Sequence, residues 1–220
     1  SSAFAQLPAS VDIDLADNPT ADSLEVRVRA NGATFDELVT GLTFTIRWSA
    51  SSTATLGGRY VPCINAVPLS ASPMVTNGGY NYRTYNAFGT SLIADECPAS
   101  AWAAGQWIRI MRVKVNGATG CTAFNITNDA FTTANNRDFY ISLNGVQRTG
   151  AIEATPDSVG SCSVDCLGNT GGAALPGTAC NDNNVCTLND TWSPACVCTG
   201  TFTDTDADGT CDANDGCPND

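Results

Sequence analysis

Apolar and polar residues alternate along much of the first 155 residues. The clearest runs are residues 24–29, 43–48 and 107–115, where apolar side chains recur at about every second position. Because successive side chains of a β-strand point to opposite faces, this period of two predicts strands with one buried face. Shorter candidate strands follow the same pattern at residues 11–15, 74–76, 80–85, 139–143 and 146–148.

Turn signals separate these predicted strands. Asn-Gly pairs begin at Asn31, Asn77, Asn116 and Asn144, and the last joins two short runs as a type I′ hairpin would. Eight or more strands with such turns predict an all-β fold, an antiparallel β-sandwich of the Ig-like or jelly-roll-like kind, over residues 7–155. One helical turn is expected at residues 34–39, where Thr34 would be the N-cap and Glu37 would complete a capping box.

The periodicity ends after residue 155, and the chain divides into smaller segments. We expect a linker at residues 156–177 with a local Cys162–Cys166 bridge, a Cys-rich module at 178–200, and an irregular acidic stalk at 201–220. Residues 1–6 fit either the end of a secretory signal, A-F-A before Gln6, or an ordinary terminus.

Charge follows the same division. Residues 1–155 hold 12 acidic and 10 basic residues, whereas residues 156–220 hold 10 acidic residues and no basic one. Such a tail repels nucleic acid and anionic membrane surfaces, because phosphate binding needs lysine and arginine. It suits divalent cations. The sequence contains no run of 18 or more apolar residues, the length that would predict a membrane-spanning helix.

Eleven cysteines indicate an oxidising, extracellular compartment. Zinc binding is the alternative, but the chain has no histidine and the Cys196-Val-Cys198 spacing is tight for a zinc pair. The odd total leaves one thiol without a partner within the chain. We expect Cys196 and Cys198 to pair outward rather than with each other. The disulfide candidates are Cys63, Cys97, Cys162, Cys166, Cys180, Cys186, Cys196, Cys198, Cys211 and Cys217.

Residues 204–215 read D-T-D-A-D-G-T-C-D-A-N-D, with side-chain oxygens at positions one, three, five, nine and twelve and glycine at six. Five carboxylates this close repel one another unless a hard cation such as Ca²⁺ neutralises them. The alternative is a solvated acidic linker. The predicted calcium ligands are Asp204, Asp206, Asp208, the Thr210 carbonyl, Asp212 and Asp215.

A second acidic and amide-rich run precedes this one. Asp182, Asn184, Asn189 and Asp190 could bind another calcium ion, but the same residue types build turns in disulfide-rich modules. Both interpretations stay open from the sequence.

The pattern D-x-D-x-D-G-x-C-D-x-x-D-x-C-P at residues 204–218 resembles the thrombospondin type 3 repeat. In that family, calcium and disulfides replace a hydrophobic core. Residues 176–190 resemble Cys-rich repeats of secreted Bacteroidota surface proteins, and residues 24–48 resemble the N-terminal sandwich of such proteins. This resemblance implies possible O-glycosylation at Ser23 and Ser158, each in a D-S-hydrophobic triplet. Only one complete acidic repeat is present.

Catalytic constellations are hard to find. The absence of histidine excludes Ser-His-Asp and Cys-His arrangements, and no nucleophile elbow or phosphate-binding glycine loop occurs. A carboxylate pair for glycoside hydrolysis stays open among Asp95, Glu96, Asp138 and Glu153, although acidic residues at turns are usually solvated. We therefore expect a protein that is not an enzyme.

These observations predict a secreted, cell-surface or fibre-forming structural protein. Its calcium- and disulfide-stiffened stalk would present or polymerise the sandwich, as a homo-oligomer or filament or beside other surface proteins. The alternative is an adhesin or carbohydrate-binding module in which the sandwich face or its tyrosine loops grip a glycan, with Tyr82 or Trp102 as contacts. Tyr80, Tyr82 and Tyr85 fit either an exposed binding loop or a packed hairpin. Trp48, Trp102 and Trp107 are more readily explained as core residues than as a sugar platform.

Overall fold

The computed structural model describes residues 6–17, 22–118, 121–153, 157–160, 165–169 and 173–219. The chain divides into two compact units, Ser1–Gly160 and Ser161–Asp220, near the predicted end of the sandwich at residue 155. Among the described residues, no helix is long and apolar enough to cross a membrane.

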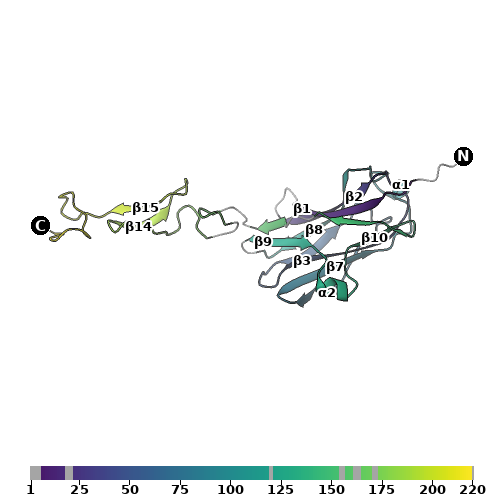
Figure 1. Cartoon of the computed structure of the whole chain (residues 1–220), viewed down its shortest axis with the longest axis horizontal. Coiled ribbons are helices and arrows are strands. Elements are labelled where there is room, and N and C mark those ends of the chain that lie inside the picture. Colours follow the sequence, from purple (N-terminus) through teal and green to yellow (C-terminus); the bar gives the residue numbers. More distant parts are fainter. Residues whose placement is uncertain are drawn as a thin grey trace. The chain divides into compact units, whose positions relative to one another are not determined.

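The first unit is a β-sandwich, so the predicted fold class is confirmed (Figure 1). One sheet has the order β12-β1-β2-β8-β4, and its strands are antiparallel except for the parallel pair β1–β12. Its strands are β1 Ser10–Asp17, β2 Ser23–Asn31, β4 Thr55–Tyr60, β8 Trp107–Asn116 and β12 Thr149–Ile152.

The second sheet is antiparallel throughout and has β3 at its centre. Its main path is β11-β10-β3-β7-β5, with β9 beside β3, β13 beside β9 and β6 beside β7. These strands are β3 Val39–Ser49, β5 Ser70–Ala71, β6 Val75–Asn77, β7 Tyr80–Ala87, β9 Cys121–Ile126, β10 Tyr140–Leu143, β11 Val146–Gln147 and β13 Asp157–Gly160.

The alternating positions of the long strands form the core between the sheets. Leu24, Val26 and Val28 of β2 are fully buried, and so are Phe44 and Ile46 of β3. Burying an aliphatic or aromatic side chain of this size contributes about 1.5–3 kcal/mol each, which explains why the period of two decides which face turns inward. The hairpin at Asn144-Gly145 also follows prediction, since both residues have positive φ, at 50° and 80°.

The tryptophans divide between core and surface. Trp48 and Trp102 are buried, as predicted. Trp107 departs from the prediction, because it is only half-buried and its ring lies 4.6 Å from the Arg29 guanidinium carbon in a cation–π contact.

Ion pairs connect neighbouring strands on the polar face of the first sheet. Asp14 pairs with Arg27 and Asp12 with Arg29, in each case directly across from each other on β1 and β2. Burial alone would raise the pKa of Asp12, but hydrogen bonds from Asn31 and Arg29 more than offset it, and the pKa lies below its usual value. The polar half of the alternation is therefore paired across the strands.

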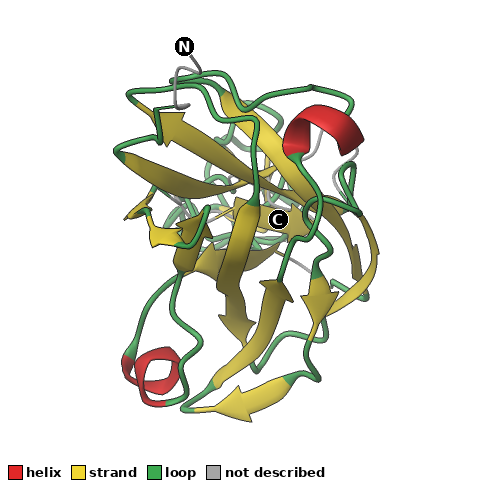
Figure 2. Ribbon diagram, turned by 90° about the vertical axis from the view of Figure 1, so that its right-hand side faces the viewer, coloured by secondary structure: helices red, strands yellow, loops and turns green. Residues whose placement is uncertain are grey.

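The predicted helical turn at residues 34–39 is wrong. Phe35 is instead buried in an isolated β-bridge with Trp102, with backbone hydrogen bonds of 3.0 and 2.7 Å in the two directions. Two short helices that the sequence analysis missed, α1 Ile93–Glu96 and α2 Ala130–Ala134, lie at the margins of the strands (Figure 2). Burial of the Phe35 ring overrides the local capping signal.

The second unit has almost no hydrophobic core. Its regular structure is one antiparallel hairpin, β14 Thr187–Trp192 and β15 Cys198–Phe202. Among the described residues of this unit, only Asp165 and Cys211 are buried. Disulfides therefore stabilise this unit, whereas apolar packing stabilises the sandwich.

The disulfide of Cys166 differs from the predicted one. Cys166 pairs with Cys196, so the predicted local bridge to Cys162 is wrong, and Cys162 itself lies outside the described residues. The carboxylate of Asp165 accepts three backbone N–H groups, including that of Ala174, and so folds the Cys166 segment into a loop of its own. Three further disulfides join Cys63 to Cys97, Cys180 to Cys198 and Cys186 to Cys211.

Three further cysteine expectations can be compared with the structure. Cys196 and Cys198 pair outward, as predicted. Cys217, a predicted disulfide candidate, is a free and exposed thiol. Cys121, which was left out of the candidates, is disulfide-bonded. Sequence spacing carries no information about these partners, because they lie far apart along the chain.

Candidate metal centre

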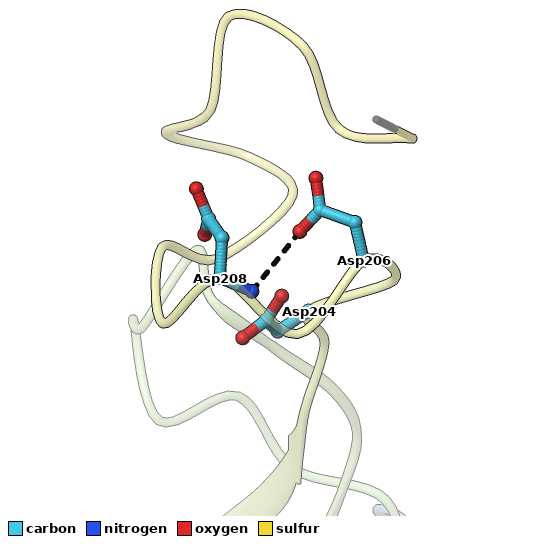
Figure 3. A group of neighbouring side chains, drawn as sticks. All are labelled: Asp204, Asp206 and Asp208. Carbon is cyan, nitrogen blue, oxygen red and sulfur yellow. Dashed lines mark hydrogen bonds between the residues drawn. The ribbon is translucent and has the colours of Figure 1, made fainter.

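Three of the predicted calcium ligands lie together in the loop that follows β15. Asp204, Asp206 and Asp208 each offer a carboxylate oxygen, and these oxygens lie within 4.8 Å of one another (Figure 3). Aspartate occupies every second position from residue 204 to 208, and the tight loop gathers all three carboxylates. Among the described residues, no other acidic group joins this cluster.

Backbone N–H groups hold these carboxylates in place. Asp206 Oδ1 accepts the N–H of Asp208 at 3.2 Å, and Asp208 Oδ1 accepts that of Thr210 at 2.7 Å. Asp204 Oδ2 accepts the N–H of Gly209 at 3.0 Å. Gly209 has φ +94°, a left-handed conformation that residues with a side chain rarely adopt. The sixth-position glycine therefore allows the turn that gathers the cluster.

One oxygen of the cluster lacks a partner. Asp204 Oδ1 is buried and accepts no hydrogen bond from the described residues, a costly state for a carboxylate oxygen. A cation at the cluster would satisfy it. The donor set consists of carboxylate oxygens alone, which suits a hard cation such as Ca²⁺ better than a metal that prefers nitrogen or sulfur. The residues present thus fit calcium.

Two of the remaining predicted ligands, Asp212 and Asp215, have other partners. Both carboxylate oxygens of Asp212 accept hydrogen bonds from Thr205, at 2.7 Å from its N–H and 2.8 Å from its hydroxyl. Asp215 Oδ1 accepts the N–H of Cys217 at 2.9 Å. The structure therefore assembles half of the predicted ligand set, and a complete calcium shell requires Asp212 and Asp215 to exchange these partners.

The acidic loop is fastened to the preceding module. Cys211 lies between the predicted ligands Thr210 and Asp212 and is bonded to Cys186. The backbone N–H of Thr203, just before the cluster, donates to the Cys186 carbonyl at 3.0 Å. Covalent and hydrogen-bonded contacts to one residue therefore limit how far the loop can open.

The second acidic run builds turns. Asp182 accepts hydrogen bonds from the N–H of Asn184 and the hydroxyl of Thr187, and Asp190 Oδ2 accepts the N–H of Asp182. Asn189 has a positive φ of 56°. These roles match the turn-building alternative.

The proposed glycan contacts and glycosylation sites are mostly buried or lie within strands. Tyr82 and Trp102, the proposed glycan contacts, are buried and cannot present a ring to a ligand, whereas Tyr80 is 39% exposed. Ser23 is also buried. Ser158 lies in β13 opposite Ala123 rather than in a linker.

Three of the four candidate catalytic carboxylates have separate local partners, and no side-chain contact of Asp95 was found among the described residues. Glu96 accepts from Asn65, Asp138 from Thr133, and Glu153 from Arg29. Each of these contacts is to a neighbouring polar side chain, and among the described residues no hydrogen bond or ion pair joins two of the candidates.

No family model and no curated protein matches the sequence. Among solved structures, the chain is similar to a type I cohesin–dockerin complex from Clostridium thermocellum (6% identity, 72% of this chain and 96% of that chain, TM-score 0.40). It is also similar to a type II cohesin domain from the cellulosome of Acetivibrio cellulolyticus (9%, 68% and 95%, TM-score 0.38). A third is a non-cellulosomal cohesin from the archaeon Archaeoglobus fulgidus (8%, 68% and 88%, TM-score 0.34). Likeness at this level assigns neither a family nor a function.

Proposed function

We propose that this chain is an extracellular structural or adhesive protein, in which a calcium- and disulfide-stiffened segment carries a β-sandwich. The observation that supports this most strongly is the unequal distribution of stabilising interactions. The apolar core is confined to the first unit, while the described part of the second unit has only two buried residues and is crossed by three disulfides. A segment built this way needs an oxidising environment to hold its shape.

Calcium would complete the stabilisation of the second unit. Asp204, Asp206 and Asp208 would hold the ion, with Asp212, Asp215 and the Thr210 carbonyl closing a shell of the six to eight oxygens that calcium takes. The bound ion would neutralise carboxylates that otherwise repel one another. Extracellular modules of this type bind calcium at about 10⁻⁴–10⁻³ M, a concentration range that external calcium reaches.

Assembly into a homo-oligomer or filament, or association with other surface proteins or glycans, would follow from holding the sandwich at a fixed spacing. Electron micrographs of native material before and after calcium removal separate these cases. Ordered filaments that loosen without calcium support polymerisation, and isolated particles in both conditions support an adhesin.

Limited proteolysis tests the calcium-stiffened segment. The full chain is digested with and without a calcium chelator, and cleavage sites are mapped by mass spectrometry. We expect chelation to accelerate cleavage within residues 201–220 while the sandwich stays intact, because its core contains none of the predicted ligands. Equal cleavage rates in that segment under both conditions would contradict the proposal.

A further inference from the structure

The outer face of the second sheet carries a polar groove. It has a volume of about 490 Å³ and is lined by Arg47 and Ser49 of β3, Ser51 and Ser52 of the following turn, Tyr80 of β7, and Ala123 and Asn125 of β9, among others. This volume lies within the range of about 300–1,000 Å³ that is usual for small-molecule sites. All of these residues belong to the first unit.

The groove exists because two neighbouring strands separate. The pairing of β3 with β9 covers three residue pairs and ends at Trp48 opposite Phe124. Beyond that point β9 continues alongside β13, whereas β3 ends at Ser49 and its chain turns. A hydrogen bond of 2.7 Å between Ser52 Oγ and Thr122 Oγ1 connects the separated segments.

Arg47 and Tyr80 form one wall of the groove. The Arg47 guanidinium carbon lies 4.3 Å from the centre of the Tyr80 ring, and Nη1 of Arg47 pairs with Asp129 at 2.9 Å. The stacked guanidinium and the ion pair fix the aromatic ring in place without leaving net charge on this wall. Tyr80 is 39% exposed, so part of its ring is open to solvent.

The groove also carries polar side chains around this ring. The Asn125 amide makes no side-chain hydrogen bond among the described residues, and Asn125 stands directly across from Arg47 in the sheet. The hydroxyls of Ser49 and Ser51, which bond to each other at 2.8 Å, are exposed at the edge. Donors and acceptors are therefore set around one aromatic ring.

We propose that this groove binds a neutral saccharide. A pyranose ring has apolar C–H faces that stack on an aromatic side chain and equatorial hydroxyls that need donors and acceptors at its rim, which is the combination found here. The groove has no unpaired lysine or carboxylate among its lining residues, so it does not select an ion. The inference does not depend on the calcium segment.

Titration of the isotope-labelled full chain by NMR tests this site. The probes are the methyl glycosides of glucose, galactose, mannose and N-acetylglucosamine, together with oligosaccharides of cellulose, chitin and mannan. We expect at least one probe to shift the resonances of residues 49–52, Tyr80 and 121–125, and to do so equally with and without a calcium chelator. If no probe shifts these resonances, or if shifts occur only elsewhere, the proposal is wrong.

Substitutions then assign the contacts. Tyr80→Ala and Asn125→Ala should each weaken binding by about tenfold or more, the size of one lost stacking or hydrogen-bonding contact. Tyr140→Ala is the matched control, because Tyr140 is 40% exposed on the same sheet but does not line the groove, and it should bind as the wild type does. Should Tyr80→Ala unfold, Tyr80→Phe and Asn125→Ala still decide the case. Unchanged affinity in Asn125→Ala and in a folded Tyr80→Ala would overturn the assignment.

Discussion

Cys186 and Cys211 are joined by a disulfide that spans 25 residues and connects the start of β14 to the middle of the acidic loop, with their Cα atoms 5.4 Å apart. Asn214, close to Asp215, donates to both sulfur atoms of this bridge, at 3.2 and 3.4 Å. The covalent framework and the candidate metal centre are therefore one structural unit.

Removing this bridge should weaken calcium binding. Closing a loop of this length removes roughly 3–4 kcal/mol of chain entropy from the open state, part of which the ion would have to supply in the double variant Cys186→Ser/Cys211→Ser. We expect a loss of calcium affinity of about tenfold or more, measured by titration. The matching double variant Cys63→Ser/Cys97→Ser removes the sandwich bridge and should leave calcium affinity unchanged. Equal calcium affinity in both double variants would show that the Cys186–Cys211 disulfide does not support calcium binding.

The cysteine pairing can be tested directly by mass spectrometry. Alkylation of the native, unreduced protein should label Cys217, the free and exposed thiol. Proteolysis without reduction should release peptides linked by Cys166–Cys196, Cys180–Cys198 and Cys186–Cys211. A linked peptide that joins Cys211 to Cys217 would contradict this arrangement.

Asp129 should contribute a pH-dependent part of the sandwich's stability. Burial opposes its ionisation, but hydrogen bonds from the Thr132 backbone, Tyr82 and Arg47 outweigh burial and lower its pKa. A carboxyl whose folded pKa lies below its unfolded value stabilises the fold above the unfolded pKa, and this stability is lost as pH falls through the folded pKa.

Asp129→Asn should therefore lower stability at neutral pH and flatten the decline in Tm below about pH 4, the unfolded value of an aspartate. The carboxylate of Asp129 also caps α2 by accepting the N–H groups of Phe131 and Thr132, and asparagine keeps this cap because it is about as good an N-cap as aspartate. Thermal melts at several pH values measure both effects. The control Asp36→Asn changes an exposed aspartate outside this network and should melt as the wild type does at each pH. An unchanged acid limb in Asp129→Asn would show that Asp129 is not linked to folding.

Gly150 should be needed for the parallel pair β1–β12. A Cβ atom at this position would overlap the Asp12 carboxylate and the Val11 carbonyl oxygen. Gly150→Ala should therefore cost about 1–3 kcal/mol of unfolding free energy, as overpacking does. Gly58→Ala in the edge strand β4 meets nothing within 4 Å and should change stability by less than about 0.5 kcal/mol. Chemical denaturation compares the two variants, and equal stabilities would contradict the close approach at Gly150.

The long strands could be predicted because their alternation is also their burial pattern. Residues 24–29 and 43–48 lie within β2 and β3 as expected. β4 escaped prediction because Gly57-Gly58 interrupts its pattern at a bulge. β9 escaped because its hydrophobic pattern does not match its burial, since polar Thr122 is buried and apolar Ala123 is exposed. Phe35 shows the opposite failure, in which a good local helix signal loses to burial beside Trp102.

The candidate site was partly predictable for a related reason. Asp204, Asp206 and Asp208 are near neighbours in sequence, so local turn chemistry is enough to bring them together. Asp212 follows Cys211, so its position depends on the Cys186–Cys211 disulfide. The spacing of the cysteines in the sequence does not show that Cys186 is the partner of Cys211. The polar groove was missed because Arg47, Tyr80 and Asn125 come from three strands that are adjacent only in the folded sheet.

The most direct test of the account is a calcium titration of the isotope-labelled, chelator-stripped full chain, followed by NMR at the amides of Asp208, Gly209 and Thr210. We expect saturable shifts at these amides with a Kd of about 10⁻⁴–10⁻³ M. Asp204→Asn should abolish them because it alters the carboxylate with the unpartnered buried oxygen, and Asp36→Asn should preserve them. The absence of saturable shifts at these amides in the wild-type chain, at calcium concentrations well above that range, would contradict the calcium-stiffened segment.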